Sequence, residues 1–136
     1  MKIKLLILGI VLTLFSGCGK SPQEVMQIGQ EHLLNEKYGF ALKSFQIIFE
    51  KHSHDSLADS AGYQIVRIYL DYLNDYDNGY KTLNSLVNNY PDSDYGIRSR
   101  EEIRLFPNWL FTTAETKRNA KDINGSIKTL DYLVNK

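Results

Sequence analysis

The stretch Lys-Thr-Leu-Asn-Ser-Leu-Val-Asn at residues 81–88 recurs at residues 128–135 as Lys-Thr-Leu-Asp-Tyr-Leu-Val-Asn, with six of eight positions identical. Each copy follows an Asn-Gly pair, Asn78-Gly79 in the first and Asn124-Gly125 in the second. Residues 41–48 carry a looser version of the same pattern. Because self-similarity of this kind is typical of stacked helical repeats, the chain is predicted to be an all-α solenoid.

Apolar residues recur at helical spacing around these copies and predict helical hairpins. Ser21, Pro22 and Glu24 form a capping box with proline at the first helical position, so the first helix is predicted to start at Pro22. Three hairpins are expected, at about residues 22–52, 57–90 and 107–136. Residues 94–106 are expected to form an additional short helix that Pro107 ends. The alternative is one long helix kinked at Pro107.

The N-terminus has the order of a cleavable export signal. Lys2 and Lys4 precede an apolar run that begins at Leu5 and ends in Leu14-Phe15-Ser16-Gly17-Cys18. The run is shorter than the roughly 20 apolar residues of a permanent membrane-spanning helix. Residues 1–17 are therefore predicted to be a signal peptide. An ordinary signal peptide followed by an incidental cysteine is the alternative.

Small residues directly before Cys18 make this segment resemble a bacterial lipobox, although Phe15 stands where leucine is usual. The resemblance implies that Cys18 becomes the first residue of the mature chain and carries a diacylglyceryl group and an N-acyl chain. No other cofactor is expected. Residues 18–21 would then be a short lipidated tether, and residues 22–136 the helical domain. Two or more acyl chains anchor a protein stably to a membrane.

Composition narrows the possible function. Two of the 16 basic residues lie in the signal peptide, so the remaining chain has 14 basic and 16 acidic residues, a formal charge of −2. Nucleic acid is not expected as a partner, because phosphate binding needs a basic patch. Cys18 is the only cysteine, which excludes disulfides. Three prolines and no alternating apolar runs favour helices over strands.

The sequence contains no recognisable catalytic or metal-binding set. His52 and His54 lie one residue apart in a polar segment, a poor geometry for a metal without a further fixed ligand. There is no nucleophile elbow and no glycine-rich phosphate loop. The chain is therefore predicted to bind no metal and to have no enzymatic activity.

The repeated pattern resembles the tetratricopeptide repeat. The matching positions in the three hairpins are Gly29, Tyr38, Ala41, Phe45 and Ile48, then Val66, Tyr76, Gly79, Leu83, Leu86 and Pro91, and then Ala114, Ile123, Ser126, Leu130 and Leu133. This resemblance implies a right-handed α-α superhelix of about three hairpins whose helices cross closely at the small residues. From Cys18 to about Asp94 the chain also resembles the tetratricopeptide lipoproteins of the bacterial outer-membrane β-barrel assembly machinery.

In this repeat class the first helix of each hairpin lines the concave groove. Carrying those positions over gives nine candidates for partner binding, with burial in the core as the alternative for each apolar one. The candidates are Met26, Gln30, Leu33, Tyr63, Arg67, Asp71, Phe111, Glu115 and Arg118.

The resemblance implies a membrane-anchored scaffold that binds protein partners in the bacterial envelope. Gly19, where aspartate would favour retention at the inner membrane, suggests the periplasmic face of the outer membrane. The cell surface or another leaflet is the alternative location. Two narrower functions stay open, which are an accessory role in β-barrel assembly and the binding of a periplasmic peptide or glycan in the groove.

Overall fold

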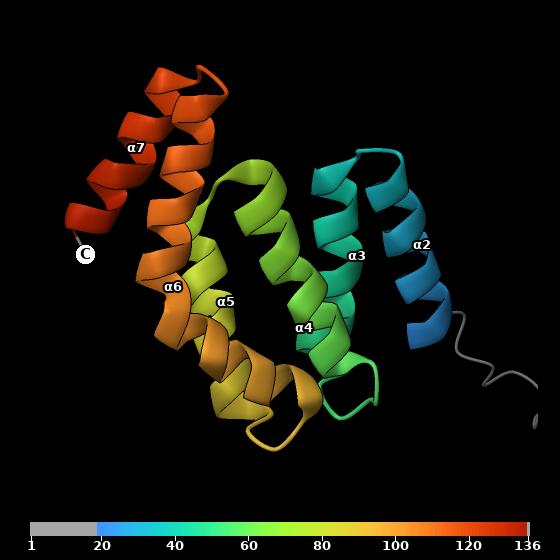
Figure 1. Ribbon diagram of the computed structural model, residues 1–136. Coiled ribbons are helices and arrows are strands. Elements are labelled where there is room, and N and C mark those ends of the chain that lie inside the picture. The colour runs from blue at the N-terminus through green and yellow to red at the C-terminus, as the bar shows by residue number, and fades with distance from the viewer. Residues whose placement is uncertain (1–18, 136) are drawn as a thin grey trace, which may run out of the picture.

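The computed structural model describes residues 19–135, which fold into six helices and no strands. Consecutive helices pack side by side as antiparallel hairpins, from α2 at one end to α7 at the other (Figure 1). This confirms the predicted all-α, tetratricopeptide-like fold. The elements are α2 (Pro22–Leu34), α3 (Tyr38–Lys51), α4 (Ala58–Arg67) with its π-helical continuation η2 (Ile68–Leu73), α5 (Tyr76–Asn89), α6 (Asp94–Asn119) and α7 (Ile123–Val134).

The first helix begins as the sequence predicts. The Ser21 hydroxyl accepts a hydrogen bond from the Glu24 backbone N–H at 3.2 Å, and the Glu24 carboxylate accepts one from the Ser21 N–H at 2.7 Å. Two of the unpaired N–H groups at the helix start are thereby satisfied. The predicted signal peptide, residues 1–17, and Cys18 lie outside the described residues. Within residues 19–135, no helix combines the length and apolarity needed to cross a bilayer.

The core consists of two apolar clusters, one on each side of α4. The first joins α2, α3 and one face of α4 around Phe45 and Ile48, which are fully buried. The second joins the other face of α4 to α5 and α6 around Leu83, Phe106 and Leu110. Burying each large apolar side chain contributes about 1.5–3 kcal/mol. The two clusters therefore bind each hairpin to the next one along the chain.

The positions expected to be small lie where helices approach closely. Gly29, Ala41, Gly79, Ala114 and Ser126 are all buried. A methyl group added at Gly29 would lie 2.6 Å from the Phe45 ring, and one at Gly79 would lie 2.2 Å from the Leu70 side chain. Larger side chains at these two positions would force the paired helices apart.

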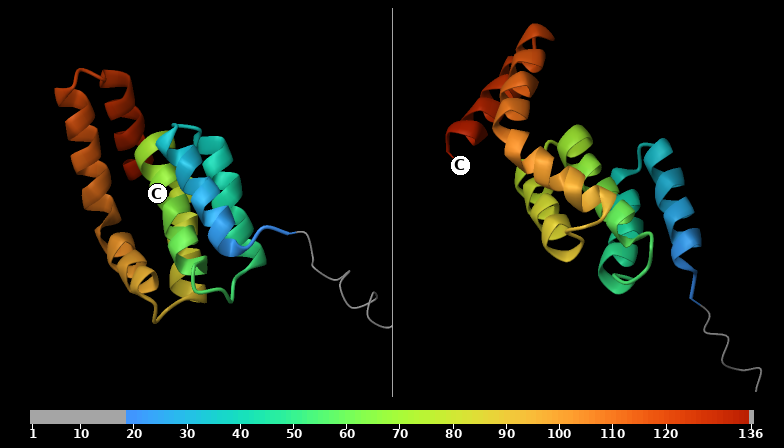
Figure 2. Two further views of the ribbon diagram at one scale, coloured as in Figure 1. Left: turned by 90° about the vertical axis from the view of Figure 1, so that its right-hand side faces the viewer. Right: turned by 60° about the horizontal axis from the view of Figure 1, so that its bottom comes forward.

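The third hairpin differs from the expected one. Residues 94–106 do not form a separate helix, because α6 is continuous from Asp94 to Asn119 with Pro107 in its interior. The hairpin is therefore made of α6 and α7 and begins at Asp94. Proline lacks the N–H donor and its ring crowds the carbonyl four residues earlier, so it bends helices. Figure 2 shows α6 changing direction along its length. Phe106 and Leu110 are buried on either side of Pro107 and hold both halves on the core.

Candidate protein-binding surface

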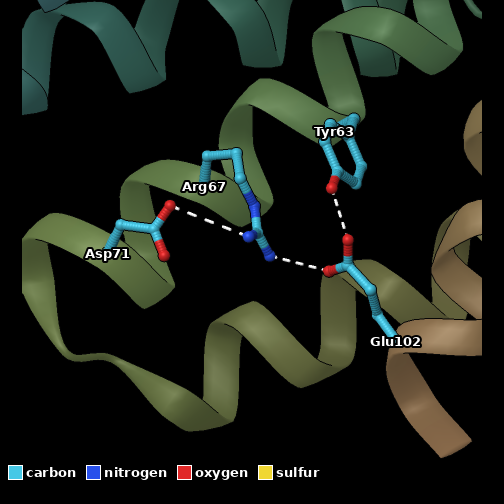
Figure 3. A network of polar contacts seen from close by, with 4 residues as sticks. All are labelled: Tyr63, Arg67, Asp71 and Glu102. Atoms are coloured by element: carbon cyan, nitrogen blue, oxygen red, sulfur yellow. Dashed lines mark hydrogen bonds and ion pairs between the residues drawn. The ribbon is translucent and has the colours of Figure 1, made fainter. Parts of the chain in front are cut away.

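A polar network connects the first helices of the second and third hairpins. One Glu102 oxygen accepts a hydrogen bond from Arg67 Nη2 at 2.7 Å, and the other accepts one from the Tyr63 hydroxyl. Asp71 pairs with the same guanidinium at 3.7 Å. Figure 3 shows Tyr63 and Arg67 on α4 and Asp71 on η2, with the Tyr63 and Arg67 side chains facing Glu102 on α6. These part-buried contacts fix the register of α6 against α4.

Two residues of this network, Tyr63 and Asp71, have raised pKa values. Burial, together with the hydrogen bond to Glu102, raises the pKa of the Tyr63 phenol from 10 to about 12. Burial also raises the pKa of the Asp71 carboxyl, because the low dielectric disfavours its charge, while Arg67 opposes the shift. Tyr63 additionally lies under two guanidinium groups, those of Arg67 and Arg98, at 5.2 and 5.4 Å from its ring centre.

A cleft opens beside this network, between the end of α4 with η2 on one side and residues 102–117 of α6 on the other. Two adjoining cavities of about 420 and 380 Å³ form it, and they share Leu70, Trp109 and Thr112. We call it the η2–α6 cleft. The remaining lining residues are Arg67, Glu102, Leu105, Phe106 and Asn108 in the first cavity and Asp71, Asn74, Thr113, Thr116 and Lys117 in the second.

Aromatic packing holds the floor of the cleft in place. The Trp109 ring stacks on Phe106 with ring centres 5.6 Å apart and makes a T-shaped contact with the Tyr76 ring, with ring centres 5.9 Å apart. Both contacts involve side chains of the second core cluster. Because its partners are buried, Trp109 presents a fixed apolar surface to the cleft. Such preorganised aromatic surfaces lose little conformational freedom when a ligand binds.

Lys117 closes one end of the cleft. Its ammonium donates hydrogen bonds to Asn74 Oδ1 at 2.6 Å, to the Tyr76 hydroxyl at 2.9 Å and to Thr129 Oγ1 at 3.2 Å. The Tyr76 and Thr129 hydroxyls are also hydrogen-bonded to each other at 2.9 Å. This cluster connects the turn after η2 with both helices of the third hairpin. The width of the cleft at this end is thereby fixed.

The structure separates the nine predicted groove residues into groups. Arg67 and Asp71 line the η2–α6 cleft. Tyr63 is 8% exposed and reaches the cleft only through its bond to Glu102. Met26 is 7% exposed and belongs to the first core cluster, which is the alternative given for it above. Leu33 is partly buried against the same cluster.

The other four candidates lie at the surface, away from the lining of the cleft. Gln30 is exposed on α2. Phe111 is 51% exposed on α6. Glu115 and Arg118 pair with each other at 3.1 Å. Gln30 thus lies on the first hairpin, which does not line the cleft, whereas the other three lie on α6.

Sequence reasoning missed most of the cleft. The expected start of the third hairpin at Pro107 leaves Glu102 and Leu105 outside it, and Asn108 is not among the nine candidates. The structure has the alternative, one long helix, and in it the apolar spacing of Phe106, Leu110 and Ala114 across the proline indicates the inner face. Within residues 19–135, no group of three or more His, Asp or Glu side chains is arranged to hold a metal.

Comparison with known protein families gives one result. The tetratricopeptide repeat profile matches residues 60–93. This stretch covers nearly all of α4, η2 and α5, the hairpin that supplies Arg67, Leu70 and Asp71 to the cleft. The second hairpin is thus tetratricopeptide-like in sequence as well as in structure. Searches of curated proteins and of solved structures found no match to the chain.

Proposed function

We propose that this protein is a non-enzymatic scaffold that binds a protein partner in the η2–α6 cleft. The match of residues 60–93 to the tetratricopeptide repeat carries the proposal, because such repeats are typically interaction modules without catalysis. The chemistry of the cleft supports it. Trp109 and Leu105 offer apolar surface, and Asn108 and Thr112 offer hydrogen-bonding groups beside it. Tryptophan and arginine are enriched among residues that dominate binding energy.

The size of the cleft favours a peptide segment as the bound element. Its first cavity, at about 420 Å³, falls within the usual range for pockets that enclose a ligand. The second cavity continues along η2, so the site is longer than one side chain needs. Arg67 is already paired with Glu102 and Asp71, which leaves apolar contact as the main source of affinity.

Site-specific photo-crosslinking in intact cells tests the cleft. A photoreactive residue at Asn108, which is exposed and lines the cleft, is compared with one at Asn88, which is exposed on α5 outside it. We expect one dominant protein crosslinked from Asn108 and absent from Asn88. Identical products from both positions, or none from Asn108, would contradict the proposal.

We further propose that Cys18 carries the lipid that the N-terminal sequence implies and that the protein lies at the periplasmic face of the outer membrane. The capping box at Ser21 supports a close membrane association, since the first helix begins at Pro22, four residues after Cys18. Intact mass of protein extracted from membranes should show the added acyl chains. Cys18→Ala should move the protein to the soluble fraction. A membrane-bound Cys18→Ala variant would argue against lipid anchoring.

A narrower candidate partner is the outer-membrane β-barrel assembly machinery. The resemblance of the lipobox, the Ser-Pro-x-Glu start and the first two hairpins to its tetratricopeptide lipoproteins supports this candidate. Purification of the tagged full chain from gently solubilised membranes should then recover a subunit of that machinery. Consistent absence of every such subunit would leave the general scaffold and remove this candidate.

A further inference from the structure

The second helix of each hairpin carries four large apolar residues at the same spacing. They recur at i, i+4, i+7 and i+11, which places them on one side of a helix. The three stripes are Tyr38, Leu42, Phe45 and Phe49 on α3, Tyr76, Tyr80, Leu83 and Val87 on α5, and Ile123, Ile127, Leu130 and Val134 on α7.

The next helix in the chain covers most of the first two stripes, although Tyr80 stays 38% exposed. On α3, Phe45 is fully buried in a cluster with Ala61 and Ile65 of α4. On α5, Leu83 is fully buried, and the Tyr80 ring lies 5.1 Å from that of Phe106 on α6. In both cases the covering helix contributes three apolar residues, with the second about one turn and the third about two turns after the first. Ile103, Phe106 and Leu110 do so on α6.

The third stripe is exposed. Ile123, Ile127, Leu130 and Val134 are 51, 58, 37 and 81% exposed, and no helix within residues 19–135 covers them. Leu83 and Leu130 are the same residue at the same position of the repeated octapeptide, yet Leu83 is fully buried. Contiguous exposed apolar surface of this kind marks interaction sites.

The first helix of the third hairpin extends this exposed surface. The turns of the second and third hairpins correspond, because Asn74 and Lys121 both have positive φ and the following Asp75 and Asp122 both cap the next helix. The π-helical η2 holds one residue more than the matching part of α6, so the fully buried Val66 and Ala114 correspond and Phe111 takes the place of Tyr63. Tyr63 is 8% exposed under α6, whereas Phe111 is 51% exposed.

Two matching positions in the second and third hairpins carry side chains of opposite charge. Glu115 takes the place of Arg67, and Arg118 the place of Asp71. In the second hairpin Arg67 faces Glu102 of the covering helix. A helix covering the third hairpin in the same way would therefore meet an acidic residue and would match it with lysine or arginine.

We infer that the surface formed by the α7 stripe, Phe111 and Glu115 binds an amphipathic helix of a partner protein. That helix presents apolar residues at i, i+3 and i+7 and a basic residue opposite Glu115. A second copy of this chain fits less well, since its α6 would bring Glu102 against Glu115. This surface is distinct from the η2–α6 cleft and goes beyond the function proposed above.

Photo-crosslinking from Ile127 in cells tests this inference, with Ile47 on α3 as the matched control. Both are exposed isoleucines, at 58 and 40%. We expect Ile127 alone to be joined to a helical segment of another protein with the stated apolar spacing and a basic residue. Glu115→Lys should lower the yield about tenfold through like-charge repulsion, and Leu130→Asp should abolish it, with the melting temperature unchanged in both variants.

Several outcomes would overturn the inference. These are crosslinks only to α7 of a second copy, crosslinks only to lipid, equal products from Ile127 and Ile47, or a yield that Glu115→Lys leaves unchanged. Thr112→Arg, which fills the η2–α6 cleft, separates the two proposals. It should remove crosslinks from Asn108 and leave those from Ile127 intact.

Discussion

Glu102 shows how one side chain connects two repeats. Its carboxylate accepts hydrogen bonds from Arg67 and from Tyr63, both on the preceding hairpin. Tyr63 is buried and the other two side chains are each 27% exposed, so removing one partner leaves the others incompletely paired in a region of lowered dielectric. The network therefore contributes more to the position of α6 than an exposed surface ion pair would.

The Tyr63 phenol makes stability depend on alkaline pH. Its pKa is about 12 in the folded protein and 10 when unfolded, so between these values the unfolded state loses the proton first. The unfolding free energy then falls as pH rises from 10 to 12. Tyr63→Phe should flatten this fall, measured by denaturant titration across that range. Tyr132, whose pKa is raised to about 12 by burial and Asp77, should account for part of the remaining slope. An unchanged slope in the variant would contradict the role of Tyr63.

Gly96 is a residue for which the backbone leaves no room for a side chain. A methyl group there would lie 1.7 Å from the Tyr90 carbonyl oxygen, which belongs to the turn before α6. We expect Gly96→Ala to lower the free energy of unfolding by about 1–3 kcal/mol. Gly39→Ala is the control, since nothing lies within 4 Å of its added methyl group and alanine favours the helix by up to about 1 kcal/mol. Equal stability of the two variants would argue against the close contact.

At the scale of the elements, α6 shapes the site. Its N-terminal half packs along α4 and α5, and its C-terminal half pairs with α7. Asn108, Trp109 and Thr112, which line the η2–α6 cleft, all follow Pro107. The bend at Pro107 therefore sets how far these residues stand from η2.

Pro107→Ala tests that relation. Alanine restores the missing N–H and removes the clash with the preceding turn, so the free energy of unfolding should rise by about 1–3 kcal/mol. A straighter α6 should also reduce crosslinking from Asn108. Urea unfolding and the crosslinking yield measure the two effects. A less stable variant would show that packing, rather than the proline, maintains the bend.

Sequence patterns predict elements well where local and tertiary preferences agree. The capping box at Ser21 and the helix end before Pro91 lie as predicted. At Pro107 the two preferences differ. Proline locally favours the start of a helix, whereas burial of Phe106 and Leu110 on both sides of it keeps α6 continuous. The same limit applies to the groove. Met26 and Gln30 lie four residues apart on α2, yet one is buried and the other exposed.

At the scale of the whole molecule, the stacking of hairpins creates the cleft. Arg67 and Glu102 are 35 residues apart in the chain and meet only because α6 packs beside α4. Periodicity identifies which residues share a face of one helix, but it carries no information on which residue of another helix lies opposite. The sequence therefore predicts Arg67 and Asp71 as groove residues and leaves Glu102, Leu105 and Trp109 unrecognised.

The affinity of the crosslinked partner for the Thr112→Arg variant tests the central claim most directly. Thr112 lines both cavities of the η2–α6 cleft, and its hydroxyl donates only to the Asn108 carbonyl at 2.9 Å, so arginine should fill the cleft without unfolding the helix. Thr82→Arg is the control, because the Thr82 hydroxyl makes the same bond to Asn78 at 2.7 Å on α5. Titration calorimetry should show at least about tenfold weaker binding for Thr112→Arg and unchanged binding for Thr82→Arg. Equal affinity of both variants and the wild type would contradict the assignment of the cleft as the binding site.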